Sequence, residues 1–320
     1  LLITGVGPPS QPRPDTATNA ASAPLTLAEE FAALPGTAGF MLARLDAGPP
    51  AVIEARLPGQ LFAVGSAFKL WVLDSVAADV AAGRLKWGQV VRLGPRSLPS
   101  GMMQDWPAGA SVTVETLATM MISISDNTAT DTLIRLVRRE RVEARIAASG
   151  HSQPAAMRPL LTTAEAFQLK LGPQTARDAY ARSDTAERRR ILAAMPAAVT
   201  TGSNNFAALA AGKPVAIDSA EWFASPQDIV RILDVLRRRS DPRVLAILGA
   251  SPGMSPDMRR SFAAAGYKGG SEPGVLNYSW LLRRPSGTWY VVTISWNNPA
   301  APVDARRLEV LALRLIDQAK

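Results

Sequence analysis

Segments with the pattern of β-strands stand near both ends of this chain, and a long helical middle separates them. The strand-like runs cover residues 39–45, 51–57, 267–271, 278–284 and 289–296. Residues 46–50 and 284–287 contain the Gly and Pro residues typical of hairpin turns, and strands joined by tight turns pair antiparallel. We therefore predict an α+β fold. Its mostly antiparallel five-stranded sheet is built from both termini, and an all-helical domain is inserted between them.

The predicted domain boundaries follow the same change of pattern. Residues 1–25 are rich in Pro, Ser, Thr and Ala without periodicity, and we expect a disordered tether there. Residues 26–86 and 225–320 form the predicted sheet domain, and residues 87–224 form the helical domain. The apolar start at residues 1–5 leaves open whether it is the remnant of a signal peptide. No run of about 18 apolar residues follows, so we expect no transmembrane segment.

The composition removes several kinds of chemistry. The 320 residues include no cysteine and one histidine, which excludes disulfides, a cysteine nucleophile and a multi-histidine zinc site. We expect neither a metal nor another cofactor. The formal net charge is +8, but the arginines fall in short groups beside acids on helix-like stretches, and no nucleic-acid-binding motif is present. We therefore expect no nucleic-acid partner.

Three short motifs carry the candidate chemistry. They are Ser66-Ala-Phe-Lys69, Ser125-Asp-Asn127 and Lys268-Gly269-Gly270. The first opens an apolar helix, where backbone N–H groups give the Ser66 hydroxyl a positive potential. Lys69 is three residues further on, so it lies on the same helix face, within reach of Ser66. Because burial lowers the pKa of a lysine and no second histidine is present, Ser66 and Lys69 are the predicted nucleophile and base.

The three motifs, read as S-x-x-K, S-D-N and a variant of K-T-G, form the signature of one enzyme superfamily. The chain resembles class A β-lactamases and penicillin-binding proteins. Through residues 160–165 (LLTTAE) it is also similar to the divergent β-lactamase-like protein of clavulanate gene clusters. The resemblance runs from about residue 39 to the C-terminus, apart from residues 150–215. It implies the β-lactamase-like form of the predicted α+β fold.

The resemblance also implies roles for the first two motifs. Ser66 forms the acyl-enzyme with Lys69 as acylation base, and Ser125 relays a proton to the leaving group. Asn127 binds a substrate amide or Lys69. Asp126 is expected to be structural, as the cap of the following helix.

The third motif and its neighbour supply the remaining implied contacts. Lys268 binds a substrate carboxylate and tunes Ser125, and Gly270 lets substrate backbone lie close to the strand. Ser271 offers its backbone N–H, together with that of Ser66, as an oxyanion hole. Gly269 stands where the family has a hydroxyl side chain, which removes one polar contact to substrate.

The chain departs from class A β-lactamases between the second and third motifs. Those enzymes hydrolyse the acyl-enzyme with a glutamate in an omega loop of pattern E-x-x-L-N, and this pattern is absent here. The stretch where it should fall, residues 206–213, contains no acid, and residues 150–215 carry a family-atypical insertion. Glu165 and Glu221 are the nearest glutamates, and the sequence leaves open whether either folds into the site. His151, in a loop-like stretch, is expected at the surface rather than in catalysis.

Two functions follow as hypotheses. The first is a serine hydrolase of the β-lactamase fold that acts on a small-molecule acyl substrate, a β-lactam or an ester, and is weak as a β-lactamase because the omega-loop glutamate is missing. The alternative is a penicillin-binding or sensor-type protein that is acylated at Ser66 but barely turns over. The resemblance implies a periplasmic or secreted bacterial protein, and the oligomeric state is left open.

Overall fold

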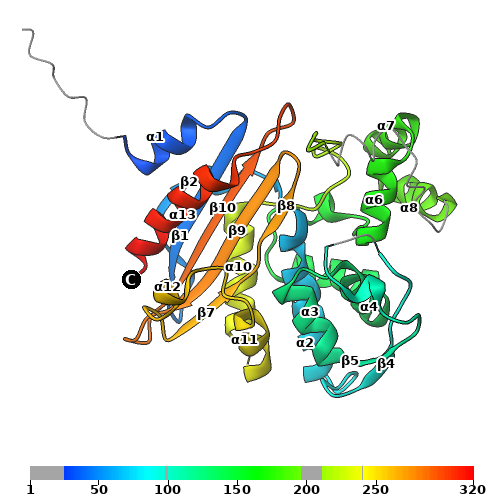
Figure 1. Cartoon of the computed structure of the whole chain (residues 1–320), viewed down its shortest axis with the longest axis horizontal. Helices are drawn as coiled ribbons and strands as arrows, with labels where there is room; N and C mark the ends of the chain where they lie inside the picture. Colours follow the sequence, from blue (N-terminus) through cyan, green and yellow to red (C-terminus); the bar gives the residue numbers. More distant parts are fainter. Residues whose placement is uncertain (1–24, 98–99, 196–210, 240) are drawn as a thin grey trace, which may run out of the picture.

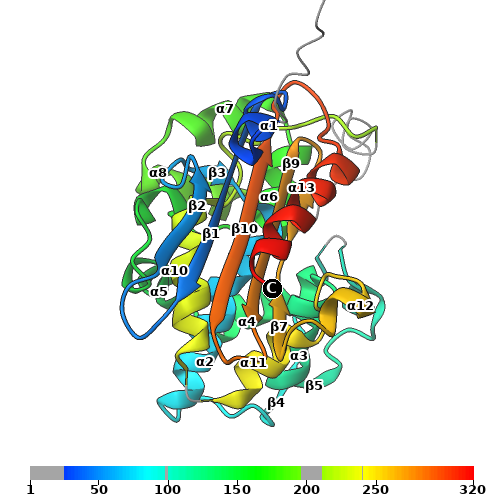
Figure 2. The same ribbon diagram turned by 90° about the vertical axis from the view of Figure 1, so that its left-hand side faces the viewer.

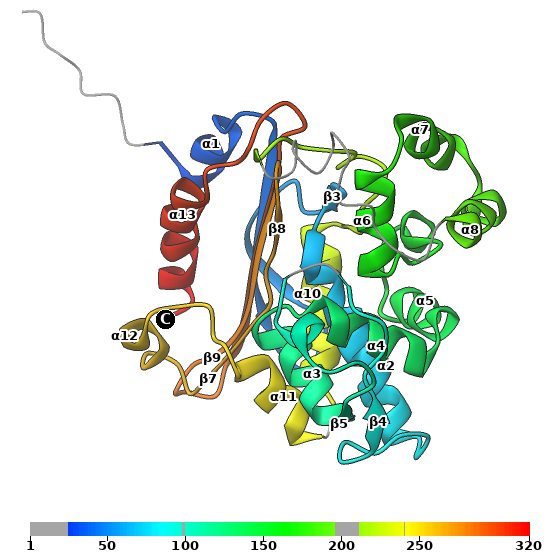
Figure 3. The same ribbon diagram turned by 45° about the vertical axis from the view of Figure 1, so that its right-hand side comes forward.

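A computed structural model of the chain describes residues 25–97, 100–195, 211–239 and 241–320. The expected tether at residues 1–25 lies outside this part, apart from Leu25. A twisted sheet has helices on both faces, and a second group of helices lies to one side of it (Figure 1). Figure 3 shows the sheet nearly edge-on, with α1 and α13 on one face and α10 on the other. Within the described residues, no helix is long and apolar enough to span a membrane.

The main sheet is built from both ends of the chain. Its order is β2-β1-β10-β9-β7, with every neighbouring pair antiparallel, and β8 also pairs with β9. The strands are β1 Thr37–Leu45, β2 Ala51–Arg56, β7 Ala264–Tyr267, β8 Gly270–Glu272, β9 Val275–Arg283 and β10 Trp289–Asn297. The predicted five-stranded antiparallel sheet is therefore confirmed. Its fifth position is shared by β7 and β8, which are interrupted at Lys268 and Gly269.

Helices cover both faces of the sheet, so the central strands are apolar nearly throughout rather than at alternate positions. On the outer face, α1 and α13 pack on β1 and β10, as Figure 2 shows face-on. The helices are α1 Leu27–Ala32 and α13 Ala305–Gln318. Thr26 and Glu29 form the capping box at the start of α1. This apolar layer covers the outer face of the sheet, and the helices that carry the first two motifs lie on the other side of the sheet (Figure 3).

The inner face packs against two later helices and the turn that carries Ser66, and the helices that carry the first two motifs pack on those two helices in turn. These elements are β3 Phe62–Ala63, η1 Gly65–Phe68, α2 Lys69–Ala81, α3 Val114–Ser123, α4 Asn127–Val137, α5 Arg139–Ala148, β6 Phe223–Ala224, α10 Pro226–Arg237 and α11 Pro242–Gly249. The remaining short elements are β4 Val90–Arg92, η2 Met103–Asp105, β5 Ser111–Thr113, η3 Pro154–Met157 and α12 Pro256–Arg259. One large apolar core joins the helices to the sheet, which fixes the helical motifs against the edge strand.

Several of the arginines bind buried aspartates. Asp74 on α2 is fully buried and accepts from Nε of Arg145 at 2.7 Å and from Nε of Arg239 at 2.8 Å. Asp79 accepts from Nε of Arg84 at 2.9 Å and from Nη1 of Arg141 at 2.9 Å. Part of the positive charge in the sequence therefore anchors helices to one another.

His151 is buried, and its expected place at the surface is wrong. Its side chain has no exposed area. Its Nε2 lies 2.9 Å from the carbonyl oxygen of Phe223, and its Nδ1 accepts from the backbone N–H of Gln153. Its ring lies 5.5 Å from that of Trp71. A turn at Gly150, with φ of 80°, directs the chain back onto the core, so the loop-like composition marks a turn and not an exposed loop.

Candidate active site

Ser66 lies in a turn of 3-10 helix between β3 and α2. Residues three apart eclipse one another in such a turn, so Lys69, the first residue of α2, follows Ser66 on the same side. Gly65 enters the turn with φ of 49°, in the left-handed region. The expected serine at the opening of an apolar helix is thus observed, with a 3-10 turn as its first turn.

Lys69 is completely buried and has three oxygen partners. Its Nζ atom donates to the carbonyl oxygen of Ser125 at 2.6 Å and to Oδ1 of Asn127 at 2.7 Å, and it lies 3.0 Å from Oγ of Ser125. In the described part of the chain, no hydrogen bond joins this amine to Ser66. Burial, and then the charge of Lys268, lower the pKa of Lys69 well below its ordinary value of 10.5.

Ser125 occupies the break between α3 and α4 with a left-handed backbone. Its φ is 59°, which costs a non-glycine residue strain and is typical of functional sites. Its carbonyl oxygen accepts from the hydroxyl of Ser100 at 2.7 Å as well as from Lys69. Asp126 caps α4 by accepting from the N–H of Ala129 at 2.8 Å, as expected. These contacts hold the Ser125 side chain toward the sheet.

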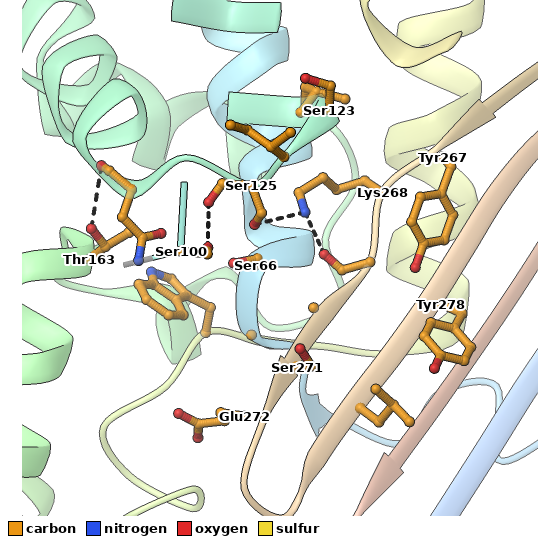
Figure 4. Close-up of a pocket in the computed structure, with 18 of the residues that line it drawn as sticks. Ser66, Ser100, Ser123, Ser125, Thr163, Tyr267, Lys268, Ser271, Glu272 and Tyr278 are labelled. Atoms are coloured by element: carbon orange, nitrogen blue, oxygen red, sulfur yellow. Dashed lines mark hydrogen bonds between the residues drawn. The ribbon is translucent and has the colours of Figure 1, made fainter. Parts of the chain in front are cut away.

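Lys268 approaches the same serine from the sheet. It is 3% exposed, and its Nζ atom donates to Oγ of Ser125 at 3.1 Å and to the carbonyl oxygen of Gly269 at 2.5 Å. Figure 4 shows this amine pointing across the pocket at Ser125. Burial lowers the pKa of Lys268 to about 7. The Ser125 hydroxyl therefore stands between two lysine amines that both lose their protons easily.

The hydroxyl of Tyr267 fills the place left by the glycine in the middle of the third motif. A Cβ atom on Gly269 would overlap this hydroxyl and lie 2.9 Å from Cζ of the ring. Tyr267 also lines the pocket (Figure 4). The sequence showed that Gly269 lacks the hydroxyl side chain of the family motif, but it did not indicate that Tyr267 would take its place. The available signal was its position two residues before Gly269, because residues i and i+2 of an extended chain point to the same side.

Gly270 allows β8 to lie directly against the turn that carries Ser66. A Cβ atom on Gly270 would overlap the carbonyl oxygen of Val64 and lie 2.6 Å from the backbone nitrogen of Ser66. The N–H of Lys268 donates to Ser279 on β9, so the alternation of an antiparallel strand turns the N–H of Ser271 away from β9. The backbone N–H groups of Ser66 and Ser271 therefore lie on facing segments.

One open pocket of about 600 Å³ collects these groups. Seven of the eight predicted site residues line it, and the eighth, Lys69, lies beneath and touches two of them. Those seven are Ser66, Ser125, Asn127, Lys268, Gly269, Gly270 and Ser271. Figure 4 shows Ser66 and Ser125 on the helical side of the pocket and Lys268 and Ser271 at the sheet edge. The motifs, 143 residues apart between Ser125 and Lys268, are thus one site.

The region in which an insertion is predicted contributes a further wall of the pocket, at Thr163 and Phe167. Its helices are α6 Thr163–Leu171, α7 Gln174–Arg182 and α8 Thr185–Ala194. Asp131 on α4, fully buried, accepts from the backbone N–H groups of Thr163 at 2.7 Å and Ala164 at 3.0 Å. This carboxylate at a helix N-terminus anchors α6 beside the second motif. Thr163 lies at the pocket wall as a result (Figure 4).

The two nearest glutamates of the sequence have different positions. Glu165 is part of the capping box of α6 and binds Nη2 of Arg139 at 2.6 Å, and it does not line the pocket. Glu221 does line the pocket, but its carboxylate binds the ammonium of Lys170. Lys170 also binds Glu272, the residue after Ser271. Residues 206–210 of the stretch expected to hold the omega-loop glutamate lie outside the described residues.

The fold and the three motifs around one pocket are those of the β-lactamase-like superfamily of active-site serine proteins. The chain belongs to the beta-lactamase enzyme family, whose model matches residues 25–313. None of the curated proteins has a matching sequence.

Solved structures of the same fold cover nearly all of the chain. A β-lactamase from Sphaerobacter thermophilus is 22% identical, with 92% of this chain and 93% of that chain covered and a TM-score of 0.60. PBP-A is 17% identical, with 92% and 93% covered and a TM-score of 0.60. An ancestral class A β-lactamase is 18% identical, with 92% and 98% covered and a TM-score of 0.62. At these identities the likeness concerns the fold.

Proposed function

We propose that the protein is a serine acyl hydrolase that forms an acyl-enzyme on Ser66 and acts on β-lactams, on esters or on both. The observation that carries the proposal is the chain of hydrogen bonds from Lys69 through Ser125 to Lys268 beside Ser66. A buried amine of lowered pKa is a base that can take the proton of a serine hydroxyl.

In acylation, Ser66 Oγ attacks the substrate carbonyl and its proton passes to Lys69. Two of the partners of Lys69, the carbonyl of Ser125 and the amide oxygen of Asn127, only accept hydrogen bonds, so they use both N–H groups of a neutral amine. The lone pair of Lys69 Nζ is then available to accept a proton from a hydroxyl group. The backbone N–H groups of Ser66 and Ser271 stabilise the oxyanion that forms.

The leaving group receives its proton from Ser125. Its hydroxyl lies within hydrogen-bond distance of both lysine amines, so a proton given to the leaving atom can be replaced from Lys69 or Lys268. A substrate carboxylate at this end of the pocket pairs with the ammonium of Lys268, and the hydroxyl of Tyr267 stands in for the missing side chain at Gly269.

A penicillin-binding or sensor-type role is the second candidate, and one observation favours it. Glu221 lines the pocket, but its carboxylate accepts from the ammonium of Lys170 and from the backbone N–H of Trp222 at 3.2 Å. These two bonds occupy the carboxylate. If no other group activates water, the acyl-enzyme persists. Such a protein would be acylated as described but would not turn over.

The experiment follows turnover and intact mass together. The protein is mixed with a chromogenic cephalosporin and, separately, with nitrophenyl acetate, with Ser66→Ala as the control. Continuous release of chromophore by the parent supports the hydrolase. A stable mass increase without turnover supports the binding or sensor role. Neither adduct nor turnover with either compound would exclude both.

A further inference from the structure

The pocket has ends of opposite charge. Lys268 and Lys69 stand at the end next to Ser125, and Glu272 and Glu221 stand at the other. In Figure 4 the carboxylate of Glu272 points away from Lys268, with Ser66 and Ser271 between the two ends. A substrate acylated at Ser66 therefore meets cations on one side and carboxylates on the other.

The acidic end holds two carboxyl groups for one ammonium group. Lys170, on α6, is bound by both Glu221 and Glu272, and its side chain is 2% exposed. When both carboxyl groups are ionised, they leave a net charge of −1, and a proton shared between them neutralises the cluster. Glu221 is 1% exposed and Glu272 is 16% exposed, so Glu272 is the member that opens to the pocket. Burial beside Glu221 raises the pKa of Glu272, because the pair favours a further proton.

Aromatic rings stand beside these carboxylates. Phe167 is three residues before Lys170 on α6, on the same helix face, and it lines the pocket. Trp222 follows Glu221 directly, lines the pocket, and is held by stacking on Phe68 at 4.0 Å between ring centroids. Carboxylates next to aromatic faces favour a cation with an apolar neighbour.

The proposed function fixes which part of the substrate reaches this end. The leaving group lies at Ser125 and Lys268, so the acyl group extends along β8 past Ser271 to Glu272. Resting on the proposed function, we propose that the pocket selects acyl groups that carry an ammonium group close to the reacting carbonyl, with Glu272 as the specificity-determining residue. The ammonium takes the place of the proton that the two carboxylates otherwise share.

Ampicillin and benzylpenicillin test the proposal, because they differ only by an amino group on the acyl side. At about pH 6, where the amine is charged, the acylation efficiency kcat/KM of the parent should be roughly tenfold higher for ampicillin, which corresponds to about 1.4 kcal/mol. Glycine nitrophenyl ester against nitrophenyl acetate gives the same comparison without a β-lactam. Acylation is followed by intact mass after rapid quenching.

Glu272→Gln should reduce the penicillin ratio to near one and lower the ester ratio by about the same factor, since an α-ammonium group by itself makes an ester carbonyl more reactive. The variant keeps the shape of the side chain and leaves Lys170 paired one to one with Glu221, so we expect it to fold. Glu221→Gln tests the same charge if Glu272→Gln does not fold. Glu115→Gln is the matched control, since Glu115 lies outside the pocket at a half-exposed site on α3.

The outcomes separate the two proposals. Equal acylation of both members of each pair by the parent, or a preference for ampicillin that survives Glu272→Gln, overturns the inference and leaves the hydrolase intact. No acylation by any of the four compounds overturns the proposed function and the inference with it. A preference for ampicillin that is lost in Glu272→Gln and kept in Glu115→Gln supports the inference.

Discussion

The Nζ atom of Lys69 lies 3.0 Å from Oγ of Ser125. The same hydroxyl accepts from Nζ of Lys268 at 3.1 Å, so one serine joins the helical amine to the amine of the sheet edge. Two buried ammonium groups so close together repel each other, and this charge helps to lower the pKa of Lys69. The chemistry of the site therefore depends on the protonation states of Ser125, Lys69 and Lys268.

Ser66 and Lys69 should act as one unit. Ser66→Ala should lower the acylation rate by roughly 10⁴-fold or more, Lys69→Met by nearly as much, and the double variant by no more than the worse single one. Ser66→Ala should change the free energy of unfolding by less than about 1 kcal/mol. Acylation is measured with nitrophenyl acetate and intact mass, and folding by thermal melting. Additive losses would refute a shared role, and near-parental activity in Ser66→Ala would refute the nucleophile.

The pH dependence should differ between charged and neutral substrates. Lys268, with its pKa lowered to about 7 by burial, is cationic below that pH and neutral above it. If this cation binds the substrate carboxylate, kcat/KM for benzylpenicillin should fall on the alkaline side of about pH 7. Nitrophenyl acetate has no carboxylate, so its profile should lack this limb.

Lys268→Arg provides the control for that profile. A guanidinium stays charged throughout the working range, so the alkaline limb for benzylpenicillin should disappear in this variant. Both substrates should share an acid limb, because Lys69 must be neutral to accept the Ser66 proton. An identical alkaline limb for penicillin and ester would show that Lys268 does not act through the carboxylate.

Gly270 should be irreplaceable for catalysis. The Cβ atom of Gly270→Ala would lie 2.6 Å from the backbone nitrogen of Ser66 and would push β8 away from the Ser66 turn. Loss of one oxyanion donor lowers kcat by about 10²- to 10³-fold, and we expect a loss of that size here. Gly59→Ala is the matched control, since a Cβ atom there meets nothing within 4 Å. Equal kcat values for Gly270→Ala and the parent would contradict the proposed oxyanion hole.

The local parts of the site could be predicted from the sequence because short spacings determine them. Ser66 and Lys69 are one turn apart, and Asp126 caps the helix that starts at the next residue. The antiparallel sheet could be predicted for the same reason, because each hairpin turn lies within a short stretch of sequence. The pattern placed Lys268 in the strand-like run at residues 267–271, and the resemblance implied Ser125 as its partner.

Other parts depend on contacts that no spacing encodes. Lys170 on α6 and Glu272 on β8 are 102 residues apart, so nothing in the sequence pairs them. His151 follows the turn at Gly150, and the sequence of such a turn does not indicate whether the next residues are buried or exposed. The hydroxyl of Tyr267 lies where a side chain at position 269 would begin. A comparison of the motif residue by residue cannot predict this, because the two groups belong to different positions.

The last prediction concerns deacylation. Glu165 binds Arg139 outside the pocket, and Glu221 and Glu272 are both bound by Lys170, so we expect water to be activated by another group. Lys69 in its neutral form, with Ser125, is the group we expect. A ring-opened penicillin leaves a bulky fragment near the acyl carbonyl and hinders this water, whereas a small ester releases its alcohol and opens the site. Turnover of a short-chain nitrophenyl ester should therefore be faster than that of benzylpenicillin.

Steady-state rates for the two substrates at equal enzyme concentration, with intact mass during the reaction, measure this difference. The penicillin acyl-enzyme should accumulate as a mass adduct, and the ester adduct should not. Glu165→Gln should leave both deacylation rates unchanged, because its carboxylate binds the cap of α6 and Arg139 and lies outside the pocket. A kcat/KM for benzylpenicillin near the diffusional ceiling of roughly 10⁸ M⁻¹s⁻¹ would mean that a dedicated general base is present and that Lys69 does not activate the water.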